Sequence, residues 1–60
     1  MLYDDILYHQ TRASRELDLG LSTDNLAAAR AHLKLATLHS ERAKELARDI
    51  EDRERPLAVA

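Results

Sequence analysis

The chain has 60 residues, no cysteine and a formal net charge of -2, from 9 basic and 11 acidic side chains. A domain of this length buries too little apolar surface to be more than marginally stable, which predicts one domain that gains stability by oligomerisation. The absence of cysteine excludes disulfides and thiolate zinc sites, and it fits a cytoplasmic protein. The balanced charge excludes the strong basic field that draws proteins to nucleic acids.

The composition predicts an all-α fold. Alanine, leucine, arginine and glutamate are abundant, whereas the chain has one glycine, one proline and neither phenylalanine nor tryptophan. This balance favours helix over strand. No apolar run approaches the roughly 20 residues that cross a bilayer, and the first residues are acidic where a signal peptide would be basic. We therefore expect a soluble, cytoplasmic protein with no membrane partner.

A first helix is predicted over about residues 2–18. Asp4 and Asp5 lie in its first turn, where carboxylates favour the positive end of the helix dipole. Arg12 and Glu16 are spaced to form an ion pair, which we place on the outer surface. One face is apolar with a polar interruption in its middle, and it consists of Tyr3, Ile6, Leu7, Gln10, Ala13, Ser14 and Leu17.

The turn is predicted at residues 19–22. Gly20 suits the left-handed residue that follows a helix C-terminus, and Ser22 suits the N-cap of the next helix. With this cap, Leu21 and Leu26 take the positions of a hydrophobic staple. So short a connection makes the two helices antiparallel neighbours, which is a helical hairpin.

The second helix is predicted over about residues 23–53, because Pro56 and its effect on the preceding residue end it. The hairpin thus occupies residues 1–55, and residues 56–60 are expected to form a flexible tail. Helical spacing places one apolar face toward a partner, made of Leu26, Ala29, Leu33, Ala36, Ser40, Ala43, Leu46, Ala47 and Ile50.

The two predicted helices differ in length, about 25 Å for the first against roughly 45 Å for the second. The predicted turn places Gln10 near Leu33 and Tyr3 near Ser40. The apolar face beyond about Glu41 therefore has no partner within the chain. An exposed apolar patch of this kind marks an association site.

Pairing the long apolar face with itself in the antiparallel sense covers the patch. Leu26 then meets Ile50, and large side chains at the ends of the face meet across small ones around a two-fold axis near Leu38. We expect a homodimer in which two hairpins form a four-helix bundle, with the nine residues of the face at its interface. A glutamate in place of Ala43 is expected to dissociate this dimer and unfold much of the chain.

The turn also resembles the helix-turn-helix of DNA-binding proteins. Leu-Gly-Leu-Ser at residues 19–22, followed by Leu26 and Ala29, is similar to the turn and the buried positions of a recognition helix. The resemblance implies an alternative function, a small nucleic-acid-binding regulator built on a hairpin dimer. Glu16 stands where the motif has a small buried residue, and Arg30 is the only cation in the first turns of the second helix, which favours a capped hairpin.

The sequence contains no motif for catalysis, a cofactor or a metal ion. His32 and His39 are seven residues apart, whereas a zinc site on one helix requires histidines one turn apart. No nucleophile has a base and an orienting group at suitable spacing, and a small hairpin offers no enclosed cavity. We therefore predict a non-enzymatic interaction module, a homodimer that also presents apolar surface around Leu35, Leu38 and the C-terminal tail to a further protein.

Overall fold

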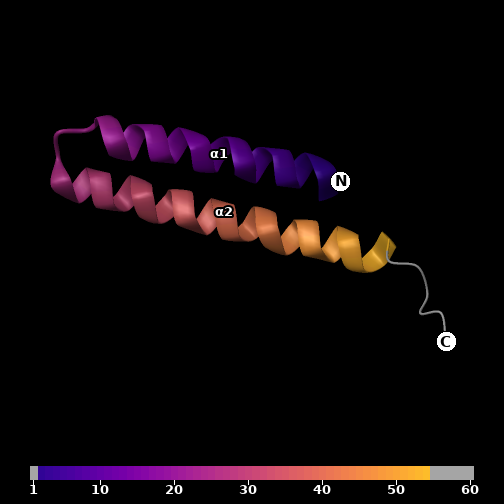
Figure 1. Cartoon of the computed structure of the whole chain (residues 1–60). Helices are drawn as coiled ribbons and strands as arrows, with labels where there is room; N and C mark the ends of the chain where they lie inside the picture. The colour runs from indigo at the N-terminus through magenta and orange to yellow at the C-terminus, as the bar shows by residue number, and fades with distance from the viewer. Residues whose placement is uncertain (1, 55–60) are drawn as a thin grey trace.

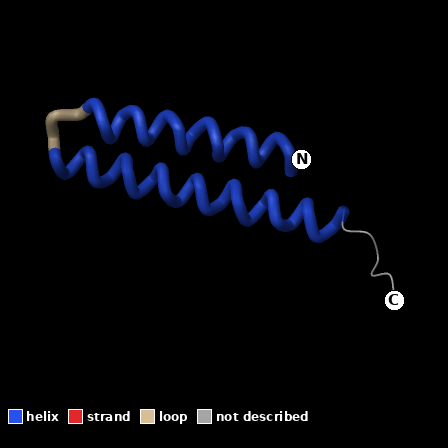
Figure 2. The backbone as a smooth tube through the Cα atoms, in the orientation of Figure 1, coloured by secondary structure: helices blue, strands red, loops and turns tan. Residues whose placement is uncertain are grey.

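The computed structural model describes residues 2–54 and contains two helices, α1 (Leu2–Ser22) and α2 (Leu26–Glu54). The helices lie side by side and run in opposite directions (Figure 1). Figure 2 shows that the short connection closes one end of the resulting hairpin. The prediction of an all-α helical hairpin is therefore confirmed. The predicted tail, residues 56–60, lies outside the described residues.

Gly20 does not end the first helix, as the sequence suggested, but lies inside α1. No described residue has a positive φ, so this glycine is not needed for a left-handed turn. It is needed for close approach, because a Cβ atom at this position would lie 2.9 Å from Leu33 Cδ2 and 3.3 Å from the carbonyl oxygen of Ala29. The helix therefore continues past Gly20, and α2 packs directly against the backbone there.

The connection is made by residues 23–25, later than the predicted turn. Ser22 belongs to the last turn of α1, where its hydroxyl donates to the carbonyl oxygen of Leu19 at 3.3 Å. The N-cap of α2 is Asn25, whose Oδ1 accepts from the backbone N–H of Ala28 at 2.9 Å. An asparagine at this position satisfies one of the free N–H groups at the start of a helix, which is why α2 begins at Leu26.

Replacing Asn25 by alanine is expected to lower the free energy of unfolding by about 1 kcal/mol, because the N–H of Ala28 loses its acceptor. Urea unfolding followed by circular dichroism measures the loss. Asp24→Ala is the matched control, since Asp24 is the exposed neighbour of the cap. Equal losses in the two variants would contradict the assignment of Asn25 as the cap.

The core of the hairpin is a seam between the two helices. Along each helix the seam residues are separated by alternating steps of three and four, the spacing of a coiled coil. All of them are buried or half-buried: Leu2, Ile6, His9, Ala13, Glu16 and Gly20 on α1, and Ala29, His32, Ala36, His39, Ala43, Leu46 and Ile50 on α2. The core is thin, since no described side chain is fully buried.

The predicted overhang of the second helix is absent within the described residues. His9 lies against His39, and the hydroxyl of Tyr3 donates to Oε1 of Glu54 at 2.6 Å. Ile50 is accordingly buried within one chain. The reason is the position of the turn: because α1 continues to Ser22, the pairing moves along α2 and the start of α1 reaches the end of α2.

Candidate functional site

A buried carboxylate forms the centre of a polar cluster in the seam. Glu16 is only 3% exposed. Its Oε2 accepts from Nη2 of Arg12 at 2.8 Å, and its Oε1 accepts from Nδ1 of His32 at 2.6 Å. The predicted pair of Arg12 and Glu16 is thus formed, but it lies between the helices and not on the outer surface.

These partners set the charge state of the cluster. The hydrogen bond from His32, helped by the charges of Arg12, His32 and His39, holds the pKa of Glu16 below its ordinary value of 4.5, although burial acts in the opposite direction. Arg12 does not use all of its hydrogen-bond donors, since its Nε is buried and has no hydrogen-bond partner among residues 2–54. Glu16 is therefore a carboxylate at neutral pH and holds two donors from different helices.

Two histidines meet in the seam about two turns from Glu16. Nδ1 of His9 and Nδ1 of His39 are 2.8 Å apart, so one ring must donate a proton that the other accepts. The ring of Tyr8 lies edge-on to both, at centroid distances of 5.0 Å from His9 and 6.0 Å from His39. The contact gives each of the two half-buried rings a hydrogen-bond partner on the opposite helix.

The same cluster does not form a metal centre of the usual kind. No group of three or more histidine, cysteine, aspartate or glutamate side chains in residues 2–54 is placed to hold a metal ion. Neither of the two described helices combines the length and the apolar character that crossing a membrane requires.

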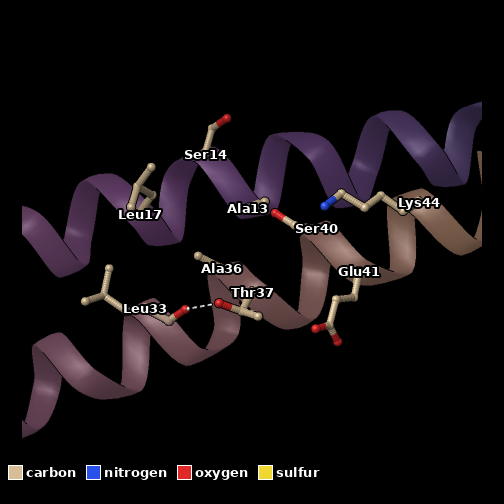
Figure 3. A pocket seen from close by; sticks show the side chains of 9 residues that line it. All are labelled: Ala13, Ser14, Leu17, Leu33, Ala36, Thr37, Ser40, Glu41 and Lys44. Carbon is tan, nitrogen blue, oxygen red and sulfur yellow. Dashed lines mark hydrogen bonds between the residues drawn. The ribbon is translucent and has the colours of Figure 1, made fainter.

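The second feature is a groove along one side of the seam. Its main hollow has a volume of about 480 Å³ and lies between Ser14 and Leu17 of α1 and Leu33 and Ser40 of α2. Figure 3 shows the side chains that line it, which include the charged Glu41 and Lys44. A neighbouring hollow of about 350 Å³ extends the groove toward Ala47. Small side chains form its floor, and the hollows are open, so the groove is a surface and not an enclosed cavity.

Large apolar side chains remain exposed around this groove and elsewhere. Leu7 is 61% exposed, Leu21 is 72% exposed and Leu26 is 66% exposed. Leu21 and Leu26, predicted to be a staple, are therefore largely open to solvent. The exposed large side chains are Tyr3, Leu7, Tyr8, Leu17, Leu19, Leu21, Leu26, Leu33, Leu35 and Leu38. They leave the hairpin with more large apolar surface outside than inside.

The structure divides the nine residues predicted for the dimer interface into two groups. Ala36, Ala43, Leu46 and Ile50 are buried in the seam of a single chain, and Ala29 and Ser40 are half-buried. Leu26, Leu33 and Ala47 are exposed. The predicted face therefore combined seam residues with residues of the groove, about a quarter-turn apart on α2.

Sequence reasoning missed the polar members of the seam, which are Glu16 and the three histidines. A signal for them was present, because His32 and His39 continue the alternating spacing that runs from Ala29 to Ile50. The two histidines were missed because they are polar, and a search for apolar spacing does not count a histidine at a core position.

No protein-family model, no curated protein and no solved structure matches the chain.

Proposed function

We propose that this chain is a non-enzymatic interaction module whose hairpins associate into a homodimeric four-helix bundle. One observation carries the proposal: within residues 2–54, ten large apolar or aromatic side chains are exposed, whereas only Leu46 and Ile50 of that size are buried. A hairpin with so thin a seam gains little stability from its own core. Covering its exposed leucines with another layer of helices supplies what the single chain lacks.

The dimer interface is assigned to the groove and the leucines beside it. Ala36 and Ala43 are already used within the chain, so the surface left for a partner is the exposed one, with Leu17, Leu33 and Ala47 along it. This revises the interface predicted from sequence and keeps the predicted type of assembly. The exposed Leu35 and Leu38 remain the surface proposed for a further protein partner.

Sedimentation equilibrium over a range of protein concentrations tests the proposal. The expected mass at micromolar concentration is twice that of the 6.8 kDa chain. A well-folded monomer at these concentrations would remove the proposal. Titration with DNA and RNA at low and high salt is the second arm, because binding that falls steeply with salt would support the nucleic-acid alternative instead.

A further inference from the structure

An exposed row of residues on α1 has the same spacing and the same order of apolar and polar positions in both directions along the helix. We call it the α1 row: Tyr3, Leu7, Gln10, Ser14, Leu17 and Leu21, all exposed. The steps between them are four, three, four, three and four residues, and their character runs apolar, apolar, polar, polar, apolar, apolar. None of them is charged, although 33% of the chain is. Interfaces are depleted in charge at their centres.

The α1 row lies where a second neighbouring helix would have to be. At about 100° per residue, the row is centred about 100° around α1 from its seam residues. In a four-helix bundle each helix contacts two neighbours on adjacent sides. The seam provides one of these contacts, with α2 of the same chain, and the α1 row is placed for the other.

We infer that the occupant of this face is a second copy of the chain, docked so that the two α1 helices run antiparallel to each other. Leu7 then lies opposite Leu17 of the second copy, and Tyr3 lies opposite its Leu21. Gln10 and Ser14 meet on either side of the two-fold axis, which crosses α1 at the level of Arg12. A two-fold interface must be self-complementary in this way. The inference rests on the proposed function and specifies its geometry.

The second helix supports the same axis independently. The contacts of Glu16 with His32 and of His9 with His39 place Arg12 at the level of Ala36. On α2, the groove side carries one residue at every seventh position, at Leu26, Leu33, Ser40 and Ala47, and Thr37 and Lys44 also line the groove between them. The midpoint of this series falls between residues 36 and 37, so the midpoints of both helices lie at one height.

Antiparallel pairing about this axis also fits the groove. Leu33 of one chain comes opposite Ser40 of the other, and Leu26 comes opposite Ala47. The protruding leucines are thus set over the hollows whose lining includes Ser40, Ala43 and Ala47. Large side chains meet small ones, which allows close packing of the helices.

The area of the face is close to what a stable dimer requires. The 21 residues of α1 make the overlap about 32 Å long, and two packed helices are about 20 Å wide. Treated as a flat rectangle, the face therefore has an area on the order of 640 Å² per chain. Side chains that project from it add further area. Specific dimers bury about 800 Å² per partner.

Cysteine pairing tests the geometry, because the chain has no cysteine of its own. Leu7→Cys and Leu17→Cys chains are prepared separately, mixed and mildly oxidised. The mixture is expected to form disulfide-linked dimers at least about tenfold faster than either variant alone, since like positions lie about 15 Å apart along the axis. Asp5→Cys with Leu19→Cys is the matched control, at the same height on the other side of α1.

Circular dichroism checks that the variants keep their helices. If the leucine replacements lose them, Gln10→Cys with Ser14→Cys tests the same pairing and leaves every leucine in place. A dimer by sedimentation whose mixture links no faster than the single variants, or no faster than the control pair, overturns the antiparallel arrangement and leaves the proposed function standing. A monomer by sedimentation overturns both.

Discussion

Replacing Ala43 by glutamate is expected to unfold most of the chain. Ala43 is buried in the seam, so the new carboxylate would have to be desolvated between the helices. Such a burial costs several kcal/mol. A core this small supplies only about 3–5 kcal/mol in total. Far-ultraviolet circular dichroism is expected to show a large loss of helix at neutral pH and room temperature.

Ala31→Glu is the matched control for this prediction. It places the same side chain on α2 at an exposed position and is expected to leave the helical signal nearly unchanged. A folded Ala43→Glu variant that is merely monomeric would contradict the position of Ala43 in the seam.

The fold class followed from the sequence because it depends on features that are local. The composition favours helices, and the apolar spacing of α1 and α2 is readable in each helix by itself. The position of the turn was harder to predict from the sequence. Glycine commonly follows the end of a helix, but Gly20 instead allows Leu33 to approach α1 closely, and only the packed structure reveals that role.

The error at the turn spread to the register and from there to the site. A turn at residues 19–22 leaves the end of the second helix uncovered, which made Ala43 and Ile50 look like interface residues. With the connection at residues 23–25, the same side chains complete the seam of one chain. A displacement of a few residues at a turn changes which molecule covers a residue far along the helix.

The polar cluster was harder to predict than the apolar seam, because its members are recognised by their partners. Glu16 reads as an exposed member of a surface ion pair with Arg12 when α1 is considered alone. The contact that places it in the core comes from His32, 16 residues further along the chain. Once His32 and His39 are placed on the seam spacing and the connection is placed at residues 23–25, the positions of Glu16 and His9 opposite them follow.

The charge of Glu16 is expected to make the stability of the hairpin depend on pH. The folded-state pKa of Glu16 is lowered from its ordinary value of 4.5, chiefly by the hydrogen bond from His32. Its stabilising contribution is therefore fully present above about pH 4.5 and is lost as the pH falls through the folded-state pKa. Protonation at low pH weakens the attraction to Arg12 and His32 that holds α1 to α2 at this point.

Glu16→Gln isolates this contribution, because the amide keeps the size of the side chain and removes its charge. At pH 7 the variant is expected to unfold at a clearly lower temperature than the unsubstituted chain, and below pH 4.5 the difference should shrink as the carboxylate is protonated. Glu45→Gln is the control, since it removes the same charge from the exposed pair with Arg42 and is expected to shift the midpoint little. Similar shifts for the two variants, or a Glu16→Gln shift that does not change with pH, would mean that the carboxylate is not what joins the helices. The half-buried Arg12 adds to the expected difference, because the variant removes the carboxylate with which its guanidinium forms an ion pair in the seam.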